Sequence, residues 1–182
     1  MKDLSLNLLD IAENSVKAEA TLTQLLLTQE GDTLTFQVVD DGRGMTEEVL
    51  KGVVDPFYTT RTTRKVGLGL PLLRMAAEQT GGTMTVESRH RDTHPDNHGT
   101  VVTAVFHTDH IDCPPVGDLV ATVTTLIQGH PDTDFYFRHV CDGTEVELDT
   151  RVLREILGEV SLAEFEVLQW ITGYLTDQYT GQ

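Results

Sequence analysis

Asp40-Asp41-Gly42-Arg43-Gly44-Met45 and Gly67-Leu68-Gly69-Leu70 are the two stretches of this sequence that decide the fold. Carboxylates precede the first pair of glycines, and a basic run precedes the second. Glycine lets the backbone approach a ligand closely and adopt positive φ, so that N–H groups can turn toward phosphate. An aspartate ahead of such a turn can accept a hydrogen bond from the amino group of a base. Neither spacing is that of a P-loop or of the dinucleotide fingerprint, so the meaning of both stretches depends on the residues around them.

The residues around the first stretch predict two strands and a short helix. Thr21–Gln29 and Thr33–Val39 are rich in β-favouring residues and flank Glu30-Gly31-Asp32, which is typical of a hairpin. The first stretch follows the second of these strands directly. Thr46 is a good N-cap with acidic residues in the following turn, so a short helix is predicted to about Gly52.

The second stretch opens another predicted helix. Residues 70–79 are helical in pattern and end at Gly81-Gly82. The N–H groups in the first turn of this helix would point at residues 67–69, an arrangement that suits an anion. Strands are predicted for residues 83–88 and 100–106, on either side of a loop rich in Asp, His, Pro and Asn.

Residues 4–18 predict a helix with an apolar face and a polar stripe. The apolar face of the helical wheel collects Leu4, Leu8, Ile11, Ala12, Ser15 and Val16. Asp10, Asn14 and Lys17 fall together on the opposite side. Such a stripe either faces water or lines a site, and the neighbouring motifs favour a site.

The sequence changes in character after Ile111. Pro114-Pro115 indicates a boundary. The elements predicted beyond it are a helix at 116–128, strands at 134–141 and 144–148, and helices at 150–158 and 162–175. The predicted organisation is therefore an N-terminal domain at residues 1–110 and a small acidic α+β extension at residues 111–182. The extension either lengthens the sheet or docks a partner.

The 182 residues carry a formal net charge of −16, which is unevenly distributed. Residues 108–182 contain 3 basic and 14 acidic residues, so this part lacks the cationic surface that nucleic acid requires. Residues 56–77, by contrast, contain three arginines and one lysine but no acidic residue. A local basic segment of this kind is what a small anionic ligand requires.

Other features of the sequence exclude several classes of site. There is no apolar run of 18 residues and no signal-peptide pattern, so no membrane segment is predicted and the cytoplasm is the expected compartment. Cys113 and Cys141 are isolated, which argues against a disulfide framework and against a zinc or iron–sulfur site. His90, His94 and His98 are spaced by four, but the Pro-Asp-Asn run between them breaks a helix and argues against a metal site.

Four motifs, taken in order, resemble the ATP-binding domain shared by DNA gyrase B, sensor histidine kinases and the mismatch-repair protein MutL. Residues 10–21 resemble the N box of this superfamily (GHKL), and Asp40-x-Gly42-x-Gly44 resembles its G1 box. Residues 55–61 resemble its F box, residues 67–70 its G2 box, and Gly99-Thr100 a further Gly-Thr element. The resemblance covers residues 4–108 and implies an α/β two-layer sandwich, in which a mixed β-sheet carries helices on one face and ATP binds with Mg²⁺.

The resemblance also implies a role for each matched position. Asn14 would bind Mg²⁺ through its side-chain oxygen, which suits a cation held mainly by phosphates and water. Asp40 would accept a hydrogen bond from the adenine amino group, with Thr100 in support. Lys17 resembles a phosphate-contacting lysine of histidine kinases, and Arg61 stands where gyrase-like members carry a lysine that senses the γ-phosphate. The other ATP-binding positions implied by the G1 and G2 boxes are Gly42, Gly44, Met45, Gly67, Leu68, Gly69 and Leu70.

Asp10 departs from the superfamily pattern. The gyrase and MutL branch has a glutamate one turn before the asparagine, where it activates water, whereas histidine kinases usually have asparagine there. An aspartate keeps the carboxylate on an arm one methylene shorter, so we predict that Asp10 is a general base for slow hydrolysis. Lys65 stands where the family often has a glycine. Residues 59–66 leave little length for the lid that covers the phosphates in this family, so a short lid is predicted. Such a lid leaves the triphosphate open or requires completion by a partner protein.

Three functions stay open from the sequence. The first is an ATP- and Mg²⁺-binding regulatory module with weak ATPase activity. The second is a protein kinase that phosphorylates a His or Ser of a partner, although no segment resembles the phosphoacceptor helix of a histidine kinase. The third is a non-hydrolytic module whose ATP occupancy controls the docking of a protein partner to the acidic C-terminal segment. The oligomeric state is left open.

Overall fold

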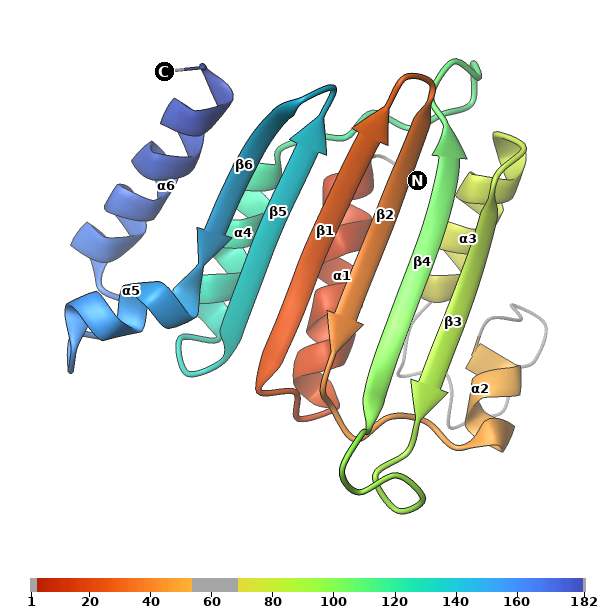
Figure 1. Cartoon of the computed structure of the whole chain (residues 1–182), viewed down its shortest axis with the longest axis horizontal. Coiled ribbons are helices and arrows are strands. Elements are labelled where there is room, and N and C mark those ends of the chain that lie inside the picture. The colour runs from red at the N-terminus through yellow and green to blue at the C-terminus, as the bar shows by residue number, and fades with distance from the viewer. Residues whose placement is uncertain (1–2, 54–68, 182) are drawn as a thin grey trace.

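The computed structural model describes residues 3–53 and 69–181. Within these residues a six-stranded sheet forms one layer and helices form the other (Figure 1). The strands are β1 Leu22–Glu30, β2 Thr33–Asp40, β3 Thr83–Arg89, β4 Gly99–His107, β5 Asp134–Cys141 and β6 Thr144–Asp149. The helices are α1 Leu4–Lys17, α2 Glu47–Val53, α3 Gly69–Gln79, α4 Leu119–Gly129, α5 Thr150–Leu157 and α6 Phe165–Tyr179. None of these helices combines the length and the apolar character that a membrane span needs.

The strands lie in the order β3-β4-β2-β1-β5-β6. Neighbouring strands are antiparallel except for β1 and β5, which pair in parallel with Leu25 opposite Phe137. The β1–β2 and β5–β6 hairpins place Gly31 and Gly143 at φ values of +57° and +91°. Glycine adopts these values without a steric cost from a Cβ, so both tight turns form readily. Because it contains one parallel pair among antiparallel ones, the sheet is mixed, as expected.

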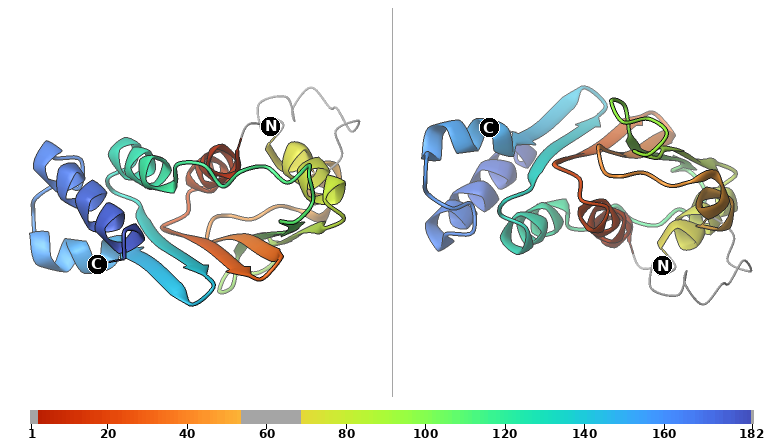
Figure 2. Two further views of the ribbon diagram at one scale, coloured as in Figure 1. Left: turned by 90° about the horizontal axis from the view of Figure 1, so that it is seen from above. Right: turned by 90° about the horizontal axis from the view of Figure 1, so that it is seen from below.

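One face of the sheet is buried, and no helix of the described residues covers the other (Figure 2). Side chains alternate along each strand, so Phe36, Phe106, Phe135 and Phe137 all reach the buried face, where each is at most 1% exposed. Helices α1, α3 and α4 cover this face (Figure 2). Burying each of these rings stabilises the fold by about 1.5–3 kcal/mol. The predicted two-layer sandwich with helices on one face is confirmed.

Residues 111–181 lengthen the same sheet. Strand β5 pairs with β1, and the hydrophobic cluster runs without a break from Leu8 in α1 to Ile171 in α6. The boundary predicted at residues 110/111 thus falls between strands of one sheet. Gln178 of α6 accepts a hydrogen bond from the Glu147 N–H (2.9 Å) and donates one to the Glu147 carbonyl (3.0 Å). These two bonds occupy part of the free edge of β6, as a further strand would.

Two helices in the C-terminal part begin later than their sequence pattern predicts. Helix α4 begins at Leu119 rather than at residue 116, because Asp118 caps it by accepting a hydrogen bond from the Ala121 N–H at 3.0 Å. Helix α6 begins at Phe165 rather than at residue 162 and continues beyond residue 175. Leu162 is buried in the turn that precedes α6, so this residue is apolar because it packs in the core and not because it belongs to the helix.

Candidate functional site

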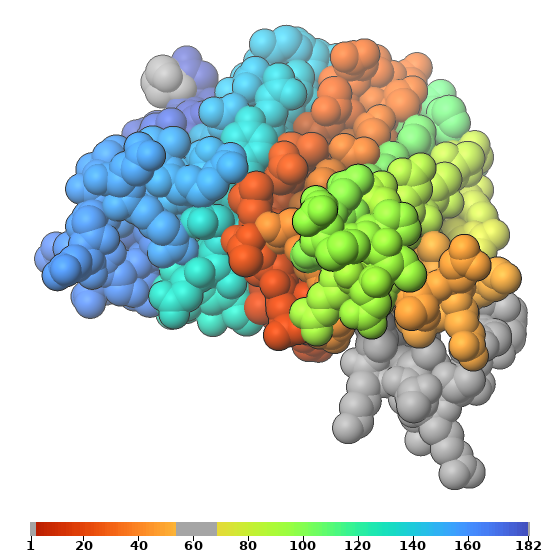
Figure 3. All heavy atoms as spheres, turned by 60° about the horizontal axis from the view of Figure 1, so that its bottom comes forward, coloured from red at the N-terminus to blue at the C-terminus, as the bar shows by residue number. Residues whose placement is uncertain are grey.

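A cavity of about 490 Å³ opens between α1, the end of β2, α2 and the start of α3. Its volume lies within the range of small-molecule sites. Helix α2 and the loop at residues 90–98 both lie at this end of the molecule (Figure 3). The apolar lining residues include Ile11, Met45, Val49, Val53, Leu70 and Val102. The polar lining residues include Asn14, Ser15, Lys17, Asp40, Arg43, Thr46, His90 and Thr100.

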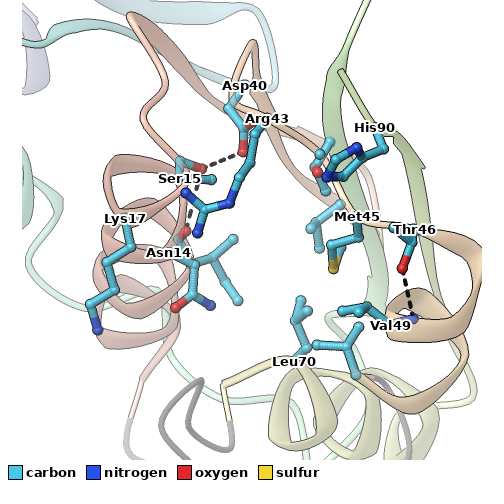
Figure 4. A pocket seen from close by; sticks show the side chains of 16 residues that line it. Asn14, Ser15, Lys17, Asp40, Arg43, Met45, Thr46, Val49, Leu70 and His90 are labelled. Carbon is cyan, nitrogen blue, oxygen red and sulfur yellow. Dashed lines mark hydrogen bonds between the residues drawn. The ribbon is translucent and has the colours of Figure 1, made fainter. Parts of the chain in front are cut away.

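Asp40 is the only acidic residue among the described residues that line this cavity. Two hydrogen bonds fix its carboxylate: Ser15 Oγ donates to Oδ2 at 2.7 Å (Figure 4), and the Gly42 N–H donates to Oδ1 at 2.9 Å. An ionised carboxylate offers about four acceptor positions, so Asp40 keeps capacity for further donors. A ligand that reaches Asp40 must therefore present a hydrogen-bond donor.

The turn after β2 needs glycine for steric reasons. Gly44 has a φ of +73°, and a Cβ at this position would collide with the backbone of Arg89. A Cβ on Gly42 would come within 2.8 Å of the Ala18 carbonyl oxygen, which already accepts a hydrogen bond from the Arg43 N–H at 2.8 Å. The turn is thus held between the end of α1 and the end of β3.

Asp41 holds the turn against the start of β1. Its carboxylate accepts hydrogen bonds from the N–H groups of Thr21 (2.7 Å) and Leu22 (3.0 Å). Partial burial raises the pKa of Asp41, but these hydrogen bonds, together with those from the Thr21 hydroxyl and the Asp41 N–H, outweigh it and the pKa lies below its ordinary value. The two adjacent aspartates therefore divide their tasks, because Asp41 fixes the backbone while Asp40 lines the cavity.

Thr100 lines the same cavity and is opposite Asp40 in the β2–β4 pair. Its hydroxyl lies 2.8 Å from Ser88 Oγ, which in turn accepts a hydrogen bond from the Met45 N–H at 2.7 Å. Thr100 is therefore joined to the turn that carries Met45, and it supports the Asp40 side of the cavity indirectly.

Helices α1 and α3 form the other end of the cavity. Asn14 and Lys17 project from the last turns of α1, and Leu70 of α3 lies across the cavity from Asn14 (Figure 4). A Cβ on Gly69 would lie 3.6 Å from both Asp10 Cβ and Ile11 Cδ1, so the N-terminus of α3 rests against α1. The first turn of an α-helix has N–H groups without an intrahelical partner, so the N-terminus of α3 suits negative charge, with Gly69 and Leu70 as its donors because Pro71 has no N–H.

The structure thus brings most of the predicted residues to one cavity. Asn14, Lys17, Asp40, Gly44, Met45, Leu70 and Thr100 line it. Gly42 acts on the cavity through Asp40, whereas Asp10 is exposed beside the start of α3 and does not line it. Arg61, Gly67 and Leu68, with the rest of residues 55–61, lie outside the described residues, so their roles stay predictions.

Ser15, Arg43 and His90 also line the cavity, although the motifs do not single them out. Ser15 belongs to the apolar face of α1, and a hydroxyl on that face is the only signal the sequence offers. Arg43 forms an ion pair with Glu19 at 3.3 Å. His90 Nδ1 accepts a hydrogen bond from the Asp92 N–H at 3.2 Å, which in the neutral ring leaves the proton on Nε2.

Residues 2–110 match the family described as histidine kinase-, DNA gyrase B-, and HSP90-like ATPase. The chain belongs to this family. Every described residue that lines the cavity lies within the matched region. The resemblance predicted from the four motifs is therefore confirmed, and this part of the chain is an ATP-binding domain of the histidine kinase type.

Two curated relatives in this ATPase family are sensor histidine kinases. ZraS from Klebsiella oxytoca is 32% identical over 88 residues, which cover 48% of this chain and 19% of that protein. YvrG from Bacillus subtilis (strain 168) is 32% identical over 99 residues, which cover 51% of this chain and 16% of that protein. The chain spans less than a fifth of the length of these two relatives.

Two solved structures share the fold. The Aquifex aeolicus MutL ATPase domain complexed with ADP superposes with a TM-score of 0.55 at 14% identity, covering 86% of this chain and 69% of that one. The N-terminal domain of a DNA repair protein gives a TM-score of 0.52 at 15% identity, covering 80% and 53%. Both superpositions cover more than residues 2–110, so the shared fold includes part of the C-terminal segment.

Proposed function

We propose that this ATPase-family chain binds ATP together with Mg²⁺ in the cavity and hydrolyses the nucleotide slowly, as a regulatory module. The Asp40 carboxylate carries the proposal, because Ser15 and Gly42 hold it in place and it is the only acidic group among the described residues that line the cavity. Adenine presents an amino donor to such a carboxylate, whereas guanine would present a carbonyl oxygen and be repelled. The faces of the base would bury apolar surface against the cavity wall.

The phosphates would lie between α1 and the N-terminus of α3. Gly69 and Leu70 would donate their backbone N–H groups from the first turn of α3, where Pro71 has none, and Lys17 would add a positive charge from the last turn of α1. Asn14 would offer its side-chain oxygen to Mg²⁺, which neutralises phosphate charge when bound. In the described residues no group of three or more His, Cys, Asp or Glu side chains could hold a metal. Phosphates and water would therefore supply most of the ligands of the ion.

Asp10 is the proposed general base for hydrolysis. It is exposed one helical turn before Asn14, next to the start of α3. Its carboxylate would take a proton from a water molecule whose oxygen attacks the γ-phosphorus. The bond from this phosphorus to the β–γ bridging oxygen then breaks, releasing ADP and inorganic phosphate. Because the aspartate arm is one methylene shorter than glutamate, we expect slow turnover.

Transfer of the phosphoryl group to a protein partner is the second candidate, and the sensor histidine kinases among the relatives favour it. A His or Ser of the partner would then attack the γ-phosphorus in place of water. A neutral imidazole nitrogen needs no base to attack, so transfer to His would not depend on Asp10. Asp10→Asn should therefore slow hydrolysis but leave transfer to a His unchanged.

Purified protein incubated with Mg²⁺ and ATP labelled at the γ-phosphorus tests these candidates. Free labelled phosphate supports hydrolysis, a labelled partner protein supports transfer, and bound but intact ATP supports a non-hydrolytic module. Asp10→Asn should lower hydrolysis by about 10²–10⁴-fold at unchanged ATP affinity, whereas the matched control Asp32→Asn should change neither. Unchanged hydrolysis in Asp10→Asn would remove Asp10 as the base. Calorimetry that detects no ATP binding in millimolar Mg²⁺ would refute all three candidates.

A further inference from the structure

Exposed apolar side chains gather on the C-terminal helices. Among the described residues, seven of the twelve large hydrophobic side chains that are exposed lie between Val152 and Tyr179. Helix α6 lies beside β6, at the opposite edge of the sheet from α2 and α3 (Figure 1). Exposed apolar surface concentrated in one region of a folded domain marks an interaction site.

One face of α6 carries a stripe of exposed residues, each three or four positions from another member, which we call the α6 stripe: Glu166, Trp170, Gly173, Tyr174 and Asp177. Trp170 and Tyr174 are 52% and 41% exposed, and their rings stack with centroids 4.9 Å apart and 10° between planes. A Cβ on Gly173 would meet nothing within 4 Å, so the surface beside the rings is open. The stacked rings form an exposed apolar surface on the outside of the helix, which we call the platform.

Carboxylates without a cationic partner in the described chain stand at both ends of the platform. Glu166 and Asp177 form no ion pair there, and the three arginines of residues 108–182 all pair elsewhere. The arginine pairs are Arg138 with Glu145, Arg151 with Asp149, and Arg154 with Asp134. The negative charge around the platform is therefore not neutralised internally, and it favours a cationic partner.

We propose that the α6 stripe docks a basic amphipathic helix of a partner protein. Such a helix would pack its apolar face on Trp170 and Tyr174 and place lysines or arginines against Glu166 and Asp177. The faces of the two rings would also attract these cations. A second copy of this chain is disfavoured, because two α6 stripes would bring carboxylates together. No residue of the stripe lines the nucleotide cavity, so the inference does not depend on the proposed function.

Trp170 is the only tryptophan in the chain, so its fluorescence reports directly on the α6 stripe. The probe is a synthetic amphipathic helix of leucine and lysine, about four turns long and without aromatic residues. Titration at low salt should shift Trp170 emission to shorter wavelength as the ring leaves water. Two control peptides should give no shift: one with glutamate in place of lysine, and one with the same composition in a non-amphipathic order. An equal shift with either control peptide would overturn the proposal.

Variants then locate the contact by the fluorescence anisotropy of a labelled probe. The pair Glu166→Lys and Asp177→Lys should weaken binding at least about tenfold. The matched control reverses two exposed charges in the β1–β2 turn, Glu30→Lys and Asp32→Lys, and should leave the affinity unchanged. Equal loss in both pairs would overturn the proposal, since it would mean attraction by net charge alone.

Removal of the rings tests the apolar half of the contact. Trp170→Ala with Tyr174→Ala should also weaken probe binding at least about tenfold, while these exposed positions leave the fold intact by circular dichroism. Light scattering should give the same oligomeric state for the unsubstituted protein and for this ring-deleted variant. Unchanged probe binding, or a dimer that depends on the rings, would overturn the proposal.

Discussion

The two halves of the sheet differ in whether a described cation is left without an ion pair, although Arg43 beside the cavity is paired with Glu19. On the β3-β4-β2 side, Lys17 lines the cavity without an ion pair to a carboxylate of the described residues. On the β5-β6 side, Arg138 and Arg154 are both neutralised by nearby carboxylates. An unpaired cation beside a cavity is available to an anionic ligand, whereas a paired one is committed to the fold. The first half therefore has the electrostatics of a binding site, and the second leaves only unpaired negative charge at its surface.

The turn glycines of the two halves differ in how closely other parts of the chain surround them. Gly44, beside the cavity, is confined by the backbone of Arg89, which lies far away in the sequence. Gly143, in the β5–β6 turn, has nothing within 4 Å of a Cβ. The conformation of the first turn is thus imposed by tertiary packing, and that of the second by the local requirements of a hairpin.

Gly44→Ala should give the largest effect on stability and is the strongest test of this difference. The added Cβ collides with the Arg89 backbone in addition to the strain of positive φ, so we expect a loss of about 3 kcal/mol or more in the free energy of unfolding. Gly143→Ala adds only the positive-φ cost of about 1–2 kcal/mol. Urea denaturation measures both. Equal losses would mean that the cavity turn relaxes freely.

Local rules account for most of the fold. The hairpins around Gly31 and Gly143, the capped helix after Thr46 and the helix that follows Gly69 all have short-range causes, and each is present where the sequence predicts it. Asp40 and Gly44 of the G1 box and Leu70 of the G2 box line one cavity, because the G1 box ends a strand and the G2 box opens a helix. These are features that a few neighbouring residues determine.

The features that the sequence does not predict are those that join distant residues. The Ser15–Asp40 hydrogen bond spans 25 positions, and Ser15 is grouped with the apolar face of α1 in the sequence pattern. The parallel pairing of β1 with β5 depends on which strand edge remains free after β2 has paired. The contact of Gln178 with the β6 edge has no local signature, because a glutamine on an exposed helix ordinarily faces water. Tertiary packing decides each of them.

Asp40→Asn is the next largest expected effect, and it acts on the cavity half alone. It replaces one acceptor oxygen by a donor while keeping the shape of the side chain. A lost hydrogen bond to a charged group costs about 1.5–3 kcal/mol, which corresponds to about 10–150-fold weaker ATP binding. Calorimetry should record this loss, with thermal unfolding confirming that the variant is folded.

Ser15→Ala tests how the carboxylate is held. It removes the 2.7 Å hydrogen bond to Asp40 and should weaken ATP binding by about fivefold, equivalent to about 1 kcal/mol. The loss is smaller than for Asp40→Asn because the Gly42 N–H still orients the carboxylate. If Ser15→Ala leaves ATP affinity intact, ATP binding does not need the Asp40 carboxylate to be oriented by Ser15 of α1.

His139 should give the other half a pH dependence of its own. It is 9% exposed, its Nδ1 lies 2.7 Å from the Tyr179 hydroxyl oxygen, and its Nε2 has no partner among the described residues. Burial lowers the pKa of His139 below its ordinary value of 6.5. The unfolded chain then binds a proton more readily, so stability is full above pH 6.5 and is lost as the pH falls below it.

His139→Gln isolates this contribution. Thermal unfolding at about pH 7.5 and about pH 5.5 brackets the window in which the unfolded histidine titrates. Between the higher and the lower pH, the midpoint temperature of unfolding should fall further in the original protein than in His139→Gln. This comparison holds even if the variant is less stable at the higher pH. Parallel decreases would mean that His139 is protonated equally in both states.

Lys17→Gln and Arg138→Gln give the smallest expected effects and return to the difference in charge between the halves. Lys17→Gln should weaken ATP binding about threefold at low ionic strength, since under the proposed function it removes one charge that would attract phosphate. Added salt should shrink this difference because it screens exposed charges. Arg138→Gln breaks an exposed ion pair with Glu145 and should change neither ATP affinity nor its salt dependence. If both variants respond to salt alike, the cation beside the cavity acts only through net charge, and the two halves do not differ electrostatically as we infer.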